Sequence, residues 1–203
     1  MEYVTVANDT PLSKVTATRA ADVCRLFELS EDAAQLLDEK QTPAGFLAAL
    51  IKHDHYADAT RFLAHALPKR EAVWWACLAA RVGLGDKPTS VQSESLRVAE
   101  QWVFKPVEEN RRPAKAVAEA AKLNNPASWA AMAAFWSSGS LAPPDQPMVP
   151  PPDYLYAKAV ASAVMLAAVM QKHEKTEDNY RTFLRQGVDI ARGGSGRPEG
   201  AQL

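Results

Sequence analysis

Two alanine-rich stretches of this chain each place a tryptophan before a run of small side chains. Residues 71–81 read EAVWWACLAAR and residues 126–136 read PASWAAMAAFW, so that Trp75 and Trp129 occupy the same place in the pattern. Alanine favours helix more than any other residue and lets two helices approach closely, so both stretches predict closely packed helices. A large aromatic side chain at the start of each run then fills the space between helix layers.

The similarity extends to the helices that precede these stretches. Ala64 and Ala66 align with Ala118 and Ala120, and a fainter third copy reads TPAGFLAAL at residues 42–50. Helix pairs that recur in this way resemble stacked helical repeats. The spacing is irregular, because one extra helix separates two of the copies. Internal duplication and chance similarity among alanine-rich helices are therefore both open.

Signals for helix starts and ends occur along most of the chain, and the alternation typical of strands is almost absent. A helix start is indicated by a capping side chain or an early proline, as at Ser30, Thr42, Pro88 and Asn125. The expected helices span residues 30–38, 43–53, 56–67, 69–82, 88–104, 113–123, 126–136, 154–172 and 177–192. The predicted fold is all-α, with about nine to ten helices in antiparallel hairpins that stack as helix pairs or as an orthogonal bundle.

A single domain is expected to hold these helices. The chain has 203 residues, 47% of them hydrophobic, which is enough for one sizeable core. An extended N-terminal segment is predicted at 1–17, the helical domain at 18–192 and a disordered tail at 193–203. Within the domain, residues 138–153 form a loop with six of the fourteen prolines. Such a run favours an extended polyproline conformation.

Charge and hydropathy exclude several classes of partner. Lys and Arg number 23 against 24 Asp and Glu, so the chain lacks the basic excess that binding to nucleic acid requires. The longest apolar run, residues 159–170, would span roughly 18 Å as a helix, well short of a hydrocarbon core of ~30 Å. We expect no membrane insertion.

A cytoplasmic location is expected for this chain. The N-terminal stretch lacks the apolar core of a secretory signal, and Cys24 and Cys77 are expected to be free buried thiols.

No residue pattern specifies a reaction, a cofactor or a metal. The segment 53–55 (HDH), with Asp58 and His65 nearby, contains metal-binding residue types, but residues two apart on a helix point to different sides, which favours capping and surface roles. The pair Glu108-Glu109 is interpreted as a solvated turn before a helix that begins at Pro113. Catalytic, cofactor-binding and metal-binding residues are therefore not assigned.

A protein-binding groove is the remaining candidate site. Trp74 and Trp75 lie about 100° apart on a helix, so both cannot point into one core. If Trp75 is the core residue, Trp74 leans toward a second layer or toward solvent; the alternative, that all of the tryptophans are core residues, stays open. Tryptophan and arginine are favoured at the centres of interfaces. The predicted partner-binding residues are Trp74, Arg81, Arg97, Trp136, Pro144, Pro147 and Val149.

Two functional hypotheses follow from these observations. In the first, the protein is a non-enzymatic accessory protein whose stacked helices present a groove to another protein. In the second, it is an enzyme or a small-molecule-binding protein with a cavity between helix layers, lined by residues such as His65, Trp102 or Tyr156. The absence of catalytic motifs favours the first. The sequence specifies neither the identity of the partner nor the oligomeric state.

Several segments resemble those of an uncharacterised all-helical family of Gram-negative bacteria. They are AVWWACLAAR (72–81), NNPASWAAMAAFWSSGSLAP (124–143), VPPP (149–152) and AKAVASAVMLAA (157–168), and the resemblance covers about residues 20–192. Members of this family are sometimes encoded beside type VI secretion genes for spike-tip and adaptor proteins. The resemblance implies a cytoplasmic accessory role, such as an adaptor or an effector-loading chaperone, and it identifies no catalytic residue.

Overall fold

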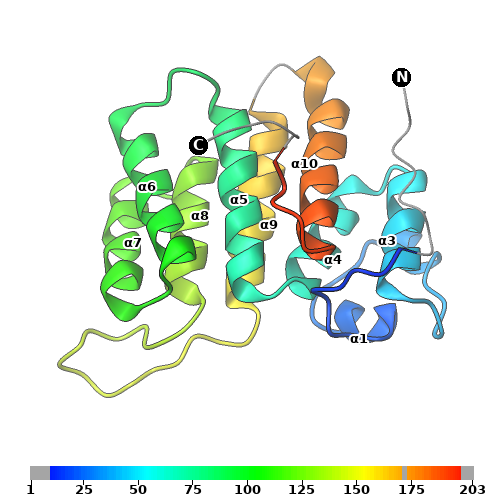
Figure 1. Ribbon diagram of the computed structural model, residues 1–203, viewed down its shortest axis with the longest axis horizontal. Coiled ribbons are helices and arrows are strands. Elements are labelled where there is room, and N and C mark those ends of the chain that lie inside the picture. Colours follow the sequence, from blue (N-terminus) through cyan, green and yellow to red (C-terminus); the bar gives the residue numbers. More distant parts are fainter. Residues whose placement is uncertain (1–9, 171–172, 198–203) are drawn as a thin grey trace.

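A computed structural model describes residues 10–170 and 173–197 of the chain, and these residues are all-α, with no strand among them (Figure 1). The predicted fold class is confirmed. The helices are α1 (Ala20–Cys24), α2 (Glu31–Ala34), α3 (Pro43–Lys52), α4 (Tyr56–Ala66), α5 (Lys69–Leu84), α6 (Ser90–Phe104), α7 (Glu108–Ala120), α8 (Pro126–Trp136), α9 (Leu155–Val169), the 3-10 helix η1 (His173–Lys175) and α10 (Thr176–Ala191). None of the described helices is both long enough and apolar enough to cross a membrane.

Side-chain caps fix the starts of the helices where the sequence indicates them. The Thr42 hydroxyl accepts a hydrogen bond from the backbone N–H of Gly45 at 3.1 Å, one turn into α3. At the start of α8, the side chain of Asn125 accepts a bond from the N–H of Ser128 at 3.0 Å. Each cap satisfies a backbone donor that has no partner inside its own helix. The predicted starts of α3 and α8 are therefore confirmed.

The centre of the fold consists of α5, α8 and α9. Helix α9 packs against α8, α5, α4 and α10, while α8 also packs against α5, α6 and α7. Figure 1 shows α6 and α7 on one side of α5 and α8, with α10, α4 and α3 on the other. Helices α8 and α9 are apolar on nearly every side and contain many buried alanines. A helix with this composition is stable only where other helices surround it.

The aromatic residues of the repeated stretches lie in different environments. Trp75 is fully buried, and its indole N–H donates to the carbonyl oxygen of Phe183 in α10 at 2.7 Å. Trp129 is only partly buried and packs edge-on against Trp136, with 6.4 Å between ring centroids. Phe46, from the third copy, is fully buried. The stacking of helices is confirmed, whereas internal duplication and chance similarity both stay open.

Helix α7 differs most from its predicted range, because it begins at Glu108 and not at Pro113. The carboxylate of Glu108 forms ion pairs with Arg111 and Arg112, one turn along the same helix. These pairs favour the helical conformation over the residues that precede Pro113, and an acid in the first turn also interacts well with the helix dipole. The interpretation of Glu108 and Glu109 as a solvated turn is therefore wrong.

Near the N-terminus, helix α1 is not predicted by the sequence, and α2 ends at Ala34, earlier than expected. Helices this short are unstable alone and depend on contacts with the rest of the fold. One such contact is the hydrogen bond from the backbone N–H of Ala20, at the start of α1, to the carbonyl oxygen of Gln41 at 2.8 Å. Short local patterns do not reveal such contacts.

Both ends of the described chain pack on α10. Residues 10–17 have no regular secondary structure, and the backbone N–H of Lys14 donates to the carbonyl oxygen of Ala191 at 2.8 Å. Residues 193–197 fold back onto the bundle, where the carbonyl oxygen of Ser195 accepts a hydrogen bond from Trp74 at 2.8 Å. The prediction of a disordered tail is therefore wrong for residues 193–197. Residues 1–9 and 198–203 lie outside the described part of the chain.

Candidate functional site

The proline-rich strap, residues 138–153, leaves the body of the fold between α8 and α9 (Figure 1). Residues 143–150 are exposed, and the exposed fractions of Met148 and Val149 are 70% and 50%. Folded proteins bury most of their large apolar side chains, so two that are exposed side by side in one loop indicate a contact surface. The strap is therefore the first candidate for a functional site.

Hydrogen bonds within the strap give it a defined shape. The backbone N–H of Leu141 donates to the carbonyl oxygen of Val149 at 2.7 Å, and the Ser140 hydroxyl accepts a bond from the N–H of Val149 at 3.0 Å. These bonds join the outgoing and returning arms. The returning arm contains Pro147 and three consecutive prolines at 150–152. Proline fixes its own φ and disfavours helix in the residue before it, so this arm is held extended.

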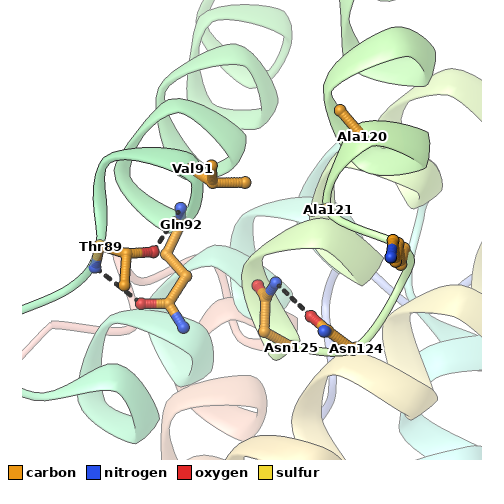
Figure 2. Close-up of a pocket in the computed structure, with 8 residues that line it drawn as sticks. Thr89, Val91, Gln92, Ala120, Ala121, Asn124 and Asn125 are labelled. Atoms are coloured by element: carbon orange, nitrogen blue, oxygen red, sulfur yellow. Dashed lines mark hydrogen bonds between the residues drawn. The ribbon is translucent and has the colours of Figure 1, made fainter.

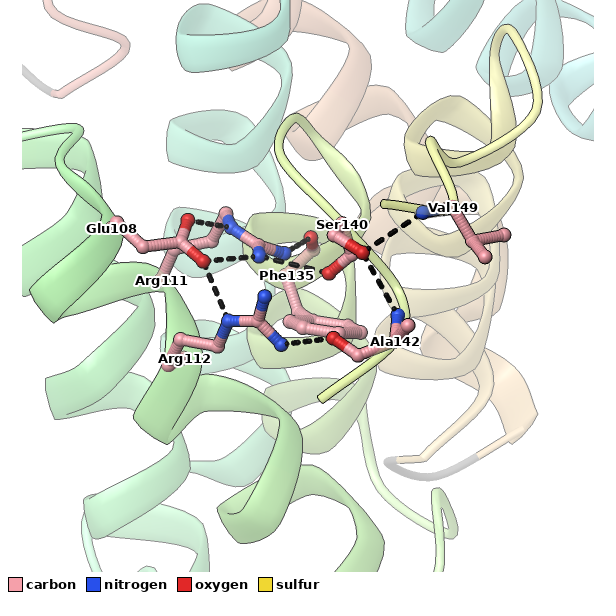
Figure 3. Close-up of polar contacts among 7 residues, drawn as sticks. All are labelled: Glu108, Arg111, Arg112, Phe135, Ser140, Ala142 and Val149. Carbon is pink, nitrogen blue, oxygen red and sulfur yellow. Dashed lines mark hydrogen bonds and ion pairs between the residues drawn. The ribbon is translucent and has the colours of Figure 1, made fainter. Parts of the chain in front are cut away.

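A fully buried arginine, Arg111, anchors the strap to α7 and α8 (Figure 3). Its Nε and Nη2 form hydrogen bonds of 2.6 and 2.7 Å with the carboxylate of Glu108. Its Nη1 donates to the carbonyl oxygen of Phe135 at 2.7 Å, and Nη2 also donates to the carbonyl oxygen of Ser140 at 3.0 Å. The guanidinium lies 4.6 Å from the centroid of the Phe135 ring. The carboxylate, the two carbonyl oxygens and the aromatic ring together stabilise the buried positive charge of Arg111.

Arg112 adds a second link between α7 and the strap. Its Nε forms an ion pair with Glu108, and its Nη1 donates to the carbonyl oxygen of Ala142 at 2.7 Å (Figure 3). Hydrogen bonds from Arg111, together with those from Arg112, lower the pKa of Glu108 to about 2. Glu108 therefore stays ionised over the physiological pH range and orients both arginines. We refer to Glu108, Arg111 and Arg112 as the arginine clamp.

The strap passes so close to the clamp that only glycine fits at position 139. Gly139 has a φ of +67°, and a Cβ atom there would lie 2.8 Å from the Nε and Nη2 atoms of Arg111. A side chain at this position would both strain the backbone and push the guanidinium out of its place. The absence of a side chain at position 139 therefore allows the start of the strap to lie directly against the guanidinium of Arg111.

The structure separates the seven predicted partner-binding residues. Pro144, Pro147 and Val149 lie on the exposed part of the strap, and Trp136 is the last residue of α8, just before the strap begins. Trp74 lies under the C-terminal segment, where Arg197 covers its ring at 4.8 Å. The strap therefore presents three of the seven residues together, and the predicted contact of Trp74 with the same partner stays a prediction.

The two remaining predicted residues, both arginines, are engaged in ion pairs on the surface. Arg81 of α5 forms a two-pronged pair with Glu100 of α6, with hydrogen bonds of 2.7 and 2.6 Å. Arg97 forms a similar pair with Glu94, three residues earlier in α6. Each of these two guanidinium groups therefore already has a carboxylate partner within the fold. A role for either arginine in partner binding stays a prediction.

Sequence reasoning misses the arginine clamp. The spacing of Glu108, Arg111 and Arg112 predicts ion pairs on one turn of a helix. It does not show that the Arg111 guanidinium is buried, because the groups that bury it, Phe135 and Ser140, are 24 and 29 residues away in sequence. The one usable signal is two adjacent arginines after an acid, close in sequence to a long loop.

The residues considered for a metal site serve to connect helices. Asp54, in the turn between α3 and α4, accepts a hydrogen bond from the hydroxyl of Tyr56 and lies 3.6 Å from Nη2 of Arg181 in α10. Asp58 accepts hydrogen bonds from the backbone N–H and the hydroxyl of Ser30, at 3.1 and 2.8 Å, and so holds the start of α2. Among the described residues, no group of three or more His, Cys, Asp or Glu side chains is arranged to hold a metal ion.

The residues named for an inter-helix cavity are packed in the core. The hydroxyl of Tyr156 donates to the carbonyl oxygen of Leu67 at 3.1 Å, and the ring of His65 stacks on Phe27 with 4.9 Å between centroids. Within the described residues, the Nε2 of His65 and the Nε1 of Trp102 have no hydrogen-bond partner. These two buried nitrogens are the features that keep the small-molecule hypothesis open.

The burial of His65 predicts a pH dependence of stability. Burial lowers the pKa of His65, and only the contact of its ring with the carbonyl oxygen of Arg61 opposes this shift. In the unfolded chain a histidine takes up its proton near pH 6.5, whereas folded His65 stays neutral to lower pH. The unfolded state then binds more protons, so the free energy of unfolding falls as pH drops below about 6.5.

Urea unfolding at a series of pH values between 7.5 and 5 measures this effect. We expect the wild-type protein to lose stability over that range, and the loss to be smaller in His65→Asn, which does not titrate. The other histidines are unchanged in this variant, so the difference between the two curves isolates His65. Identical pH dependence in both proteins would contradict the assignment.

Two pockets of the described structure are open to solvent. One, of about 420 Å³, lies between the start of α6 and the turn from α7 to α8 (Figure 2). The side chains of Thr89 and Gln92 that line it bond to the backbone of each other's residue and cap α6. A second pocket, of about 450 Å³, includes Cys24, whose pKa is raised by burial to about 12. Neither pocket brings together reactive groups.

Comparison with known proteins identifies a family and no function. No curated protein and no solved structure matches this chain significantly. A family model described as a family of unknown function, DUF6931, matches residues 46–191. The match extends from α3 to the last residue of α10 and includes the strap with its clamp. The resemblance to an uncharacterised family is thereby confirmed, and the chain belongs to the family of unknown function DUF6931.

Proposed function

We propose that this protein is a non-enzymatic accessory protein, of adaptor or chaperone type, that binds another protein through the proline-rich strap. The observation that supports this proposal is the combination of an exposed, proline-rich, apolar loop with a buried arginine that holds its base. Connections between helices in a bundle usually take 2–8 residues, and much longer ones are often functional. The strap between α8 and α9 is well above that range.

The returning arm of the strap fits the way that proteins recognise proline-rich segments. Pro147 and Pro150 are three residues apart, which is one turn of a polyproline helix, so their rings lie on the same side. Met148 and Val149 between them add exposed apolar area. Such segments bind in grooves lined by aromatic side chains. Because the arm is already extended, little conformational entropy is lost on binding.

The arginine clamp explains how the strap keeps its shape without a core of its own. A buried guanidinium is unfavourable unless every donor is satisfied, and here Glu108 and two carbonyl oxygens satisfy it. A loop whose only role is to connect two helices does not require such an anchor. We infer that the clamp holds the strap in its binding conformation before the partner arrives.

The resemblance described above suggests the setting of this role. It implies a bacterial protein that acts in the cytoplasm beside a secretion system of type VI, where a spike component or an effector would be the partner. The strap would then be the surface that such a partner binds.

A site-specific photo-crosslinker at Met148 tests the proposal in cells of the native host. We expect one dominant crosslinked protein, identified by mass spectrometry, which a crosslinker at Val91 does not capture; Val91 is 46% exposed and lies at the start of α6. With that partner purified, replacing Pro147 and Pro150 together by alanine is expected to weaken binding at least about tenfold. The melting temperature should be unchanged, because both prolines are exposed.

Two results would contradict the proposal. One is equal affinity of the purified partner for the wild-type protein and the double proline variant. The other is capture of the same protein from Met148 and from Val91, which would show that contact does not depend on the strap. A partner whose binding surface contains no aromatic side chain would retain the proposed role but exclude polyproline recognition.

A further inference from the structure

The C-terminal segment, residues 193–197, lies across α5 and α10, away from the strap on α7 and α8 (Figure 1). The indole N–H of Trp74 donates to the carbonyl oxygen of Ser195 at 2.8 Å, and the guanidinium of Arg197 lies 4.8 Å from the centroid of the Trp74 ring. On the α10 side, the backbone N–H of Gly196 donates to the carboxylate of Asp189 at 2.8 Å.

The middle of the segment fits between the two helices because position 196 is glycine. Gly196 is buried and has a φ of +72°. A Cβ atom there would lie 2.8 Å from the Cδ1 atoms of both Leu78 and Ile190. The surface of α5 and α10 thus has three parts that match the segment. They are an aromatic ring with an indole donor, a narrow gap that favours glycine, and a carboxylate that accepts a backbone N–H. We call this surface, formed by Trp74, Leu78, Asp189 and Ile190, the Trp74 groove.

Few contacts hold the segment, and ordering it has an entropic cost. The contacts are a few hydrogen bonds and one cation–π interaction near the surface, each of modest strength. Against them stands the loss of backbone entropy in a segment that contains Gly193, Gly194 and Gly196, and glycine loses more conformational freedom on ordering than any other residue. A partner segment with the same chemistry can therefore compete for the groove.

We infer that the Trp74 groove is a binding site for an extended, glycine-containing peptide segment that carries an arginine, supplied by a partner protein. In this structure the chain's own residues 193–197 occupy the groove and show the required chemistry. A partner's arginine would stack on Trp74, its backbone carbonyl would accept the indole N–H, and its glycine would enter the gap beside Leu78 and Ile190. The chain's own segment then acts as an internal competitor. This inference is independent of the strap.

NMR spectroscopy of the full chain tests this inference, since its five tryptophans give five indole N–H signals. The probe is the synthetic peptide RGGSGRPE, with the sequence of residues 192–199. In the wild-type protein the internal segment has a high effective concentration, and the peptide should leave the Trp74 signal unchanged. Gly196→Ala is expected to expel the internal segment and to shift the Trp74 signal. The peptide should then bind at least about tenfold more tightly than to wild type.

Matched controls separate peptide binding from a general loss of structure. The Trp75 indole signal reports the core and should stay in place in Gly196→Ala. Ser195→Ala should keep the Trp74 signal close to its wild-type position, because the backbone carbonyl accepts the bond from Trp74. Among the described residues, the variant loses only the bond from the Arg197 N–H to the Ser195 hydroxyl. A peptide with alanine in place of its third glycine should not bind. The double replacement of Pro147 and Pro150 should leave peptide binding unchanged, so that failure of the strap proposal and failure of this one are distinguishable.

Two outcomes would overturn the inference. The first is a well-folded Gly196→Ala protein to which the peptide does not bind, and the second is peptide binding that persists when Trp74 is also replaced by alanine. If Gly196→Ala loses the Trp75 signal, Arg197→Ala provides the test, because it removes the contact with the ring and leaves the gap as it is. In that variant we expect the peptide to bind with a shift of the Trp74 signal, and absence of that shift at millimolar peptide would equally refute the site.

Discussion

Replacement of Arg111 by leucine is expected to lower the free energy of unfolding by about 2–5 kcal/mol and to release the strap from α7. The side chain is fully buried, and its loss leaves the carbonyl oxygens of Phe135 and Ser140 without their donor. Each unsatisfied buried acceptor costs roughly 1–3 kcal/mol. Glu108 adds less to the loss, because its side chain is 48% exposed and regains water.

Urea unfolding and limited proteolysis measure the two effects of Arg111→Leu. The strap should be cleaved much faster in the variant, at sites within residues 138–153. Arg97→Leu is a matched control, since Arg97 also pairs with a glutamate three residues earlier in its helix but is exposed. Exposed pairs contribute at most about 1 kcal/mol, so this control should lose little stability. Equal losses in the two variants would show that the burial of Arg111 is not what matters.

Replacement of Trp75 by alanine is expected to cost about 3–5 kcal/mol, the range for removing a fully buried large aromatic side chain. Trp75 lies at the junction of α5 and α10, where its indole N–H bonds to Phe183, and the neighbouring α4 contributes Leu63. The variant would leave a large cavity and an unpaired carbonyl oxygen at that junction. The variant would be partly unfolded at room temperature only if the free energy of unfolding of the whole protein lies near the lower end of the usual range of about 5–15 kcal/mol.

The adjacent residue supplies the control for this experiment. Trp74→Ala should cost clearly less than Trp75→Ala, because the Trp74 ring is only partly buried at the edge of the core and also contacts the C-terminal segment. Chemical denaturation of the two variants side by side gives the comparison. A cost for Trp74→Ala equal to that of Trp75→Ala would contradict the assignment of Trp74 to a surface site and favour the view that all of the tryptophans are core residues.

The strap and the Trp74 groove lie on different helices and differ in chemistry. In the two proposals, the strap is a preformed, proline-rich ligand for a groove on another protein, whereas the Trp74 groove receives a glycine-containing segment. The proposed adaptor role would use both surfaces, one for each of the proteins that it joins. This division differs from the single groove expected from the sequence, in which Trp74 and the strap residues contact the same partner.

Sequence alone determined the all-α fold class and most of the longer helices of this protein. Alanine-rich stretches, capping residues and prolines act locally, within a few residues, and they specify α3, α5, α8 and the position of the strap correctly. The spacing of Trp74 and Trp75 also shows that the two side chains point in different directions. Which one enters the core depends on where α10 packs, and no local pattern contains that information.

Only the tertiary structure decided which polar and aromatic groups are buried and what covers them. The same Glu–Arg spacing gives an exposed ion pair at Arg97 and a fully buried guanidinium at Arg111. The C-terminal end of α8 and the start of the strap cover Arg111 but not Arg97. In the same way, a glycine-rich segment that looks disordered fits between α5 and α10. Whether a side chain is buried depends on segments that are distant in sequence, whereas helix propensity depends on neighbouring residues. Local sequence patterns therefore specify helices but not which side chains are buried.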